Sequence, residues 1–146
     1  MNRMSLRIGI DIGSTTVKVV LLDEQNKLLF RSYERHYSKA RERAAETLRS
    51  LADRLAGRQV RIVITGSAGL GVAKAAEIDF VQEVYATAAA VNQYIPDTDA
   101  VIELGGEDAK IIFFGGALVL YATGIRVSEL IGLAAPAPSS TRWPPS

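Results

Sequence analysis

The expected fold is decided by the stretch Ile8-Gly9-Ile10-Asp11-Ile12-Gly13-Ser14-Thr15-Thr16-Val17-Lys18. In it an apolar strand runs into an acidic residue, a glycine and a short polar turn, and a second apolar strand follows. The same plan recurs in Val101-Ile102-Glu103-Leu104-Gly105-Gly106-Glu107-Asp108-Ala109-Lys110-Ile111-Ile112. Two such hairpins, facing each other across a cleft, can hold the phosphates of a nucleotide and its magnesium ion. The repeated motif therefore predicts a phosphate-binding site.

The first hairpin has residue types that suit phosphate and metal. A glycine lets the backbone approach a phosphate without a Cβ in the way, and amides and hydroxyls of the turn can donate to phosphate oxygens. Asp11 is expected to hold magnesium, typically through water. Lys18 lies just beyond the turn and could point either way. The candidates for binding phosphate are Gly13, Ser14, Thr15, Thr16 and Lys18.

The alternative for one hairpin is an ordinary tight turn whose polar residues have no ligand. The second hairpin makes that alternative less favourable, because two buried strands of one small domain then end in glycine turns. Gly105 and Gly106 again leave room for phosphate, and Glu103 takes the place of Asp11 as a metal ligand. The acidic residues expected to act in catalysis, by positioning metal or water, are Glu103, Glu107 and Asp108.

Two other phosphate-binding motifs do not fit the sequence. The glycine-rich segment 66–71 lacks the following Lys and Ser/Thr of a P-loop, and no G-x-G-x-x-G turn follows the first strand. Segment 66–71 is predicted to be a flexible loop after a strand. It could add backbone donors to the site, or it could be a plain connection.

Composition excludes several classes of function. The net charge of +1 over 146 residues gives no field that would favour nucleic acid or an acidic membrane surface. No apolar run approaches the roughly 20 residues that span a bilayer, so a cytoplasmic location is the default. Because the sequence has no cysteine, it offers no thiolate ligand for zinc or an iron–sulfur cluster. The single histidine, His36, lies in a polar segment and is predicted to be on the surface.

The spacing of apolar residues predicts an α/β fold with a mixed sheet and helices packed outside it. The sheet would start as an antiparallel meander and continue in parallel after a helix that Ser38 caps and that ends near Gly57. A second helix would carry Val81, Val84, Ala88, Val91 and Ile95 and stop at Pro96. The predicted strands are 7–12, 16–22, 28–35, 60–64, 99–104, 109–114 and 117–121. One domain over 1–133 and a disordered Ala/Pro/Ser-rich tail over 134–146 are expected.

Both hairpins resemble those of a known superfamily. Residues 8–18 resemble the first phosphate motif of acetate kinases, sugar kinases, heat-shock chaperones and actin. Together with the segment 103–110, they look like the activator ATPases of 2-hydroxyacyl-CoA dehydratases and benzoyl-CoA reductases. Residues 63–67 and 82–91 are also similar to that family, and the resemblance covers roughly 6–116. It implies a ribonuclease H-like, actin-like ATPase lobe that binds ATP or ADP with Mg²⁺.

The resemblance also implies partners and a point of departure. Family members are homodimers that share one iron–sulfur cluster and drive an electron into a partner dehydratase or reductase. After Gly116 the sequence no longer follows the family, because neither the cluster cysteine, nor an adenosine motif, nor a second lobe is present. A truncated or frame-altered N-terminal domain is therefore expected, with hydrolysis absent or very slow. The alternatives are a non-enzymatic interaction or dimerisation domain and, less favoured, a sugar or acetate kinase fragment.

Overall fold

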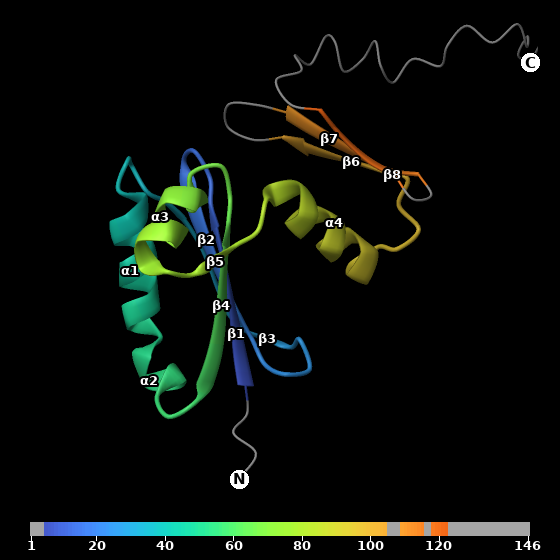
Figure 1. Cartoon of the computed structure of the whole chain (residues 1–146). Helices are drawn as coiled ribbons and strands as arrows, with labels where there is room; N and C mark the ends of the chain where they lie inside the picture. The colour runs from blue at the N-terminus through green and yellow to red at the C-terminus, as the bar shows by residue number, and fades with distance from the viewer. Residues whose placement is uncertain (1–4, 105–108, 116–117, 123–146) are drawn as a thin grey trace, which may run out of the picture. The chain divides into compact units, whose positions relative to one another are not determined.

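The computed structural model of the chain describes residues 5–104, 109–115 and 118–122 (Figure 1). It divides into two compact units, with the boundary between Pro96 and Asp97. The first unit contains a five-stranded sheet with helices, and the second contains a three-stranded sheet. The predicted tail over 134–146 and the predicted domain end at 133 lie outside the described residues.

The first sheet has the strand order β3-β2-β1-β4-β5. β1 pairs antiparallel with β2, and β2 pairs antiparallel with β3, while β4 runs parallel to β1 and β5 runs parallel to β4. The predicted meander and the parallel return after a helix are both confirmed. The strands are β1 (Ser5–Ile12), β2 (Thr16–Leu22), β3 (Leu28–Arg35), β4 (Gln59–Thr65) and β5 (Asp79–Phe80).

Strict alternation along the strands separates the two faces of this sheet. Ile8, Ile10 and Ile12 are at most 2% exposed and lie on one face. Helices α1 (Ala40–Ser50) and α3 (Gly69–Ala76) cover that face (Figure 1) and complete the core. The buried core cluster consists of Leu6, Ile8, Ile10, Ile12, Val17, Val19, Leu21, Ala44, Leu51, Ile64 and Ala73. The opposite face carries Asp11 and Lys18, because successive side chains point to opposite sides.

The helix predicted after β3 differs from the structure in its cap and in its continuity. Lys39 is the N-cap residue and Ser38 lies before it with a φ of 64°, so the predicted Ser38 cap is wrong. At Leu51 the helix ends, and the short helix α2 (Ala52–Leu55) begins after it. Leu51 turns inward and is 1% exposed, whereas the following Ala52 is exposed.

Segment 66–71 is not a simple loop, because α3 begins inside it at Gly69. A Cβ on Gly69 would lie 2.9 Å from Ile64 Cγ2, so glycine here permits close packing of the helix on β4. The following helix α4 (Glu83–Tyr94) starts after Val81 and ends before Ile95, which is 61% exposed. Both residues therefore lie outside the helix that was expected to contain them.

The second unit contains three antiparallel strands in the order β6-β7-β8. They are β6 (Ala100–Leu104), β7 (Ala109–Gly115) and β8 (Leu118–Ala122), close to the predicted bounds. The turn 105–108 between β6 and β7 lies outside the described residues. In the described part of the chain, every helix is too short or too polar to cross a membrane.

Candidate functional site

The first candidate hairpin is a narrow turn between β1 and β2. The Gly13 amide donates to the Thr16 carbonyl oxygen at 2.9 Å, which closes the turn, and Ser14 and Thr15 form its exposed tip. Within the described residues, no group accepts a hydrogen bond from the Ser14 or Thr15 amide. Thr16 is only 9% exposed, so the accessible hydroxyls are those of Ser14 and Thr15. The tip therefore presents a small set of unused donors.

Glycine at position 13 is not required by the packing of the chain. A Cβ there would lie 3.7 Å from the Thr16 carbonyl oxygen and 3.8 Å from its hydroxyl oxygen, which is ordinary contact. The residue also does not adopt the left-handed conformation that favours glycine. Because Gly13 has no Cβ, a ligand could approach the backbone here more closely than at any other residue type.

Asp11 and Lys18 form an ion pair beside this turn. Lys18 Nζ lies 2.7 Å from Asp11 Oδ2 and 5.5 Å from the centre of the Tyr33 ring. The strand register aligns Tyr33, Lys18, Asp11 and Thr65 in one row across four strands. The question of which way Lys18 points is thus answered for this structure, since its ammonium group pairs with Asp11.

The connection from β4 to α3 packs directly against the end of β1. The Ala68 amide donates to the Ile12 carbonyl oxygen at 2.9 Å. Gly66 has a φ of 101°, and a Cβ there would lie 2.2 Å from that carbonyl oxygen and 2.6 Å from Asp11 Oδ1. Glycine is therefore required at position 66, and the connection from β4 to α3 lies directly beside Asp11.

Thr65 adds an unpartnered hydroxyl to the same row. Its Oγ1 is buried and makes no hydrogen bond within the described part of the chain. Its register partner is Asp11, so the two side chains lie on the same face of the sheet. Because a buried polar atom without a partner is costly, this hydroxyl is a candidate for contact with a ligand or its water.

The fit of these residues to magnesium rests on Asp11. Among the described residues there is no group of three or more His, Cys, Asp or Glu that could hold a metal. Magnesium is commonly held by one or two carboxylates together with substrate phosphates and water. One carboxylate beside a turn with free donors, with the Thr65 hydroxyl next to it, fits that mode of binding.

The second hairpin repeats the register of the first. In β1 and β2, Asp11 faces Lys18 and Ile12 faces Val17; in β6 and β7, Glu103 faces Lys110 and Leu104 faces Ala109. In each, the acid and the lysine form the second residue pair before the turn. Glu103 is half-buried and Lys110 is buried. The predicted residues Gly105, Gly106, Glu107 and Asp108 lie outside the described residues.

His36 is the residue that the sequence prediction placed wrongly. It is 7% exposed, and its Nε2 lies 3.1 Å from the Gly13 carbonyl oxygen. Its amide donates to the Thr15 carbonyl oxygen at 3.1 Å. A polar sequence around it suggested the surface, but the end of β3 lies beside the turn after β1 and covers the ring.

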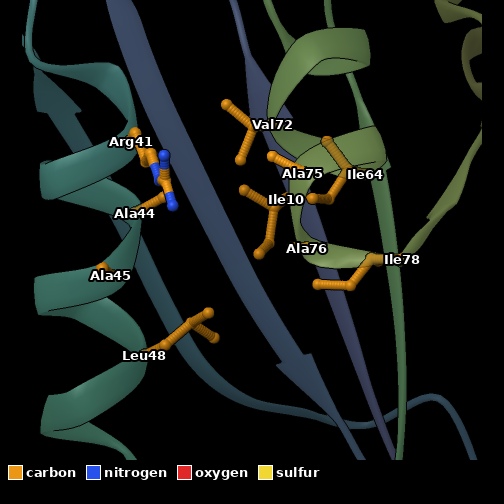
Figure 2. A pocket seen from close by; sticks show the side chains of 10 residues that line it. All are labelled: Ile10, Arg41, Ala44, Ala45, Leu48, Ile64, Val72, Ala75, Ala76 and Ile78. Atoms are coloured by element: carbon orange, nitrogen blue, oxygen red, sulfur yellow. The ribbon is translucent and has the colours of Figure 1, made fainter.

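A separate hollow of about 170 Å³ lies between α1 and α3 (Figure 2). Ile10 and Ile64 form its floor, and Arg41 is its only charged residue. Because Ile10 and Asp11 are neighbours in one strand, the hollow lies on the face of the sheet opposite to Asp11 and its row of register partners. Its apolar walls do not suit a nucleotide and its metal.

The described architecture defines a class of protein. A five-stranded mixed sheet with a glycine and hydroxyl turn after its first strand is typical of actin-like, ribonuclease H-like ATPases, and solved structures of that fold match this chain. Residues 8–125 match the model of the BadF/BadG/BcrA/BcrD ATPase family, and the chain belongs to this family. A comparison with curated proteins finds no match.

Three solved structures illustrate the similarity in fold. Component A of (R)-2-hydroxyglutaryl-CoA dehydratase from Acidaminococcus fermentans is 18% identical with a TM-score of 0.66, over 81% of this chain and 46% of that one. The activator of 2-hydroxyisocaproyl-CoA dehydratase from Clostridium difficile, with bound ADPNP, is 24% identical with a TM-score of 0.60, over 82% and 46%. A Ppx/GppA protein from Aquifex aeolicus is 16% identical with a TM-score of 0.52, over 82% and 51%. This chain thus spans about half the length of each.

Proposed function

We propose that the turn between β1 and β2 binds the phosphates of ATP or ADP together with Mg²⁺. The observation that carries the proposal is the pair of amides at Ser14 and Thr15, which have no partner within the described residues and directly follow Gly13. Amides that point at one place bind anions well, because they are fixed dipoles with little left to reorganise. The bound ADPNP named for the Clostridium difficile activator supports a nucleotide as the ligand.

Asp11 would hold the magnesium ion, through water or directly. When bound, magnesium neutralises charge on the phosphate oxygens. Lys18 would then exchange part of its contact with Asp11 for contact with a phosphate, because the Asp11 carboxylate and the phosphate compete for the same ammonium group. The ion pair is partly exposed, with side chains 37% and 32% exposed, so breaking it costs little.

The second hairpin is proposed to bind phosphate and metal as well. Glu103 would serve as a further metal ligand, Gly105 and Gly106 would approach phosphate, and Glu107 and Asp108 would orient water. The repeated register of acid and lysine in the two hairpins supports this assignment.

For the whole protein we propose the role of an activator of a 2-hydroxyacyl-CoA dehydratase or benzoyl-CoA reductase. Family membership supports it, and so do the dehydratase component A and the dehydratase activator among the similar structures. The proposed partners are the dehydratase or reductase and a second copy of this chain, in the cytoplasm. Since the sequence contains no cysteine, any iron–sulfur cluster would need ligands from elsewhere.

The experiment that tests nucleotide binding is a thermal melt of the full chain with Mg-ADP or Mg-ATP. A ligand that binds only the folded state raises the melting temperature by mass action. The proposal predicts a rise that increases with nucleotide concentration and that adenosine alone does not produce. An unchanged melting temperature at millimolar nucleotide would favour the alternative of a non-enzymatic interaction domain.

A further inference from the structure

We infer that His36 is a positioning residue that holds the turn after β1 in the conformation that binds phosphate. The inference rests on the proposed function of that turn. The ring and backbone of His36 make two bonds to the turn, to the carbonyl oxygens of Gly13 and Thr15. These carbonyl groups belong to the same short segment whose free amides would meet the phosphate.

The hydrogen bonds around the ring define its tautomer. The Ser38 amide donates to His36 Nδ1 at 3.1 Å, and a backbone amide can only donate, so Nδ1 is the acceptor. Nε2 must then carry the ring proton and donate it to the Gly13 carbonyl oxygen. A neutral ring with this single tautomer satisfies both neighbours, and the ring is almost fully covered.

The backbone directly after His36 is strained, and its conformation directs the Ser38 amide toward the ring. Tyr37 and Ser38 have φ values of 46° and 64°, in the left-handed region that non-glycine residues rarely adopt. This pair of unusual conformations turns the Ser38 amide back toward the ring, and the Lys39 amide donates to the His36 carbonyl oxygen at 2.7 Å. Strain of this kind persists where the surrounding structure fixes it, and it concentrates near functional sites.

The consequence for the turn is a fixed direction of its donors. A carbonyl group and the next amide belong to one planar peptide unit. The bond from the His36 ring to the Gly13 carbonyl oxygen therefore fixes the direction of the Ser14 amide. The bond from the His36 amide to the Thr15 carbonyl oxygen fixes the Thr16 amide in the same way. The ring donates to the first of these units alone, so its loss should release the Ser14 amide in particular.

A matched pair of variants separates positioning from mere stability. In His36→Gln the side-chain amide nitrogen can take the place of Nε2 and keep the bond to Gly13, while the acceptor for Ser38 is lost. In His36→Asn the side-chain oxygen can take the place of Nδ1 and keep the bond to Ser38, while the donor to Gly13 is lost. Each variant loses one ring hydrogen bond, so similar losses of folding stability are expected.

The test is the affinity of the full chain for Mg-ADP, measured by titration calorimetry. We expect His36→Asn to bind about tenfold more weakly, the effect of one lost ordering hydrogen bond, and His36→Gln to stay within about twofold of the parent. Equal affinities of the two variants would overturn the inference while leaving the proposed function standing. A parent chain that does not bind Mg-ADP would overturn the proposed function and the inference together.

A measurement on the unaltered protein does not depend on whether the variants fold. Nitrogen-15 NMR of the imidazole distinguishes the two neutral tautomers directly. The inference predicts a proton on Nε2 and a change in the Nε2–H signal when Mg-ADP saturates the chain. A proton on Nδ1, or a ring signal that ignores bound nucleotide, would contradict it.

Discussion

Asp11 Oδ2 lies 2.7 Å from Lys18 Nζ, and the two residues face each other across β1 and β2 in the second residue pair before the turn. The pair places one negative and one positive charge at the point where a phosphate and its metal would arrive. Glu103 and Lys110 face each other in the same register across β6 and β7. The two hairpins of this chain thus share an acid–lysine register as well as a sequence pattern.

Asp11→Asn should weaken the binding of Mg-ADP and leave the fold intact. The substitution keeps the volume of the side chain but removes the charge that offsets the metal. Because the pair with Lys18 is partly exposed, its loss should change the free energy of unfolding by less than about 1 kcal/mol. Calorimetry with Mg-ADP and urea unfolding measure the two effects, and unchanged affinity would show that Asp11 does not hold the metal.

Gly13→Ala should lower nucleotide affinity without lowering stability. The added methyl group meets only ordinary contacts within the chain, at 3.7 Å and beyond. It would, however, occupy the space through which a phosphate approaches the backbone. Without ligand, a melting temperature within a degree or two of the parent is expected, because surface substitutions rarely change the free energy of unfolding by more than about 0.5 kcal/mol. Binding as tight as the parent's would contradict this role of the glycine.

Gly66→Ala should destabilise the first unit strongly. A Cβ at position 66 would lie 2.2 Å from the Ile12 carbonyl oxygen, and the φ of 101° is itself unfavourable for alanine. We expect a loss of more than about 2 kcal/mol in the free energy of unfolding. Gly71→Ala is the matched control, because a Cβ there meets nothing within 4 Å and lies inside α3. That control should be neutral or stabilising by up to about 1 kcal/mol.

Thr65→Val should keep or raise the stability of the fold and lower the affinity for nucleotide. Valine has nearly the same shape and removes a buried hydroxyl oxygen that has no partner within the described residues. Stability should therefore hold or rise, because no hydrogen bond is lost and a desolvated polar atom is removed. If the hydroxyl contacts the nucleotide, its phosphate or a metal-bound water, affinity should fall in a calorimetric titration. A variant with unchanged affinity would assign the hydroxyl no part in binding.

Much of the fold could be predicted because its strands follow simple rules. Alternating isoleucines in β1 and short polar turns defined the meander almost to the residue. The helix α3 was hidden, because three glycines in 66–71 favour a loop by local propensity. Packing of Gly69 on Ile64 overrides that propensity, and no local pattern contains such information.

The candidate site was predictable only in part, for a similar reason. The turn residues and Asp11 stand in one continuous motif, so their proximity follows from the sequence. His36 contacts Gly13 across 23 positions of sequence, and its charged and aromatic neighbours suggest an exposed side chain. The contact exists because β3 returns alongside β2 and ends level with the turn, which is a property of the register.

The most direct test of phosphate binding by the first hairpin is a nitrogen-15 NMR titration of the full chain with Mg-ADP. The amide signals of Ser14 and Thr15 should shift together and saturate, because these amides have no partner within the described residues. Adenosine without phosphate should leave both signals in place. Shifts confined to other residues, such as those around the hollow between α1 and α3, would contradict phosphate binding at this turn.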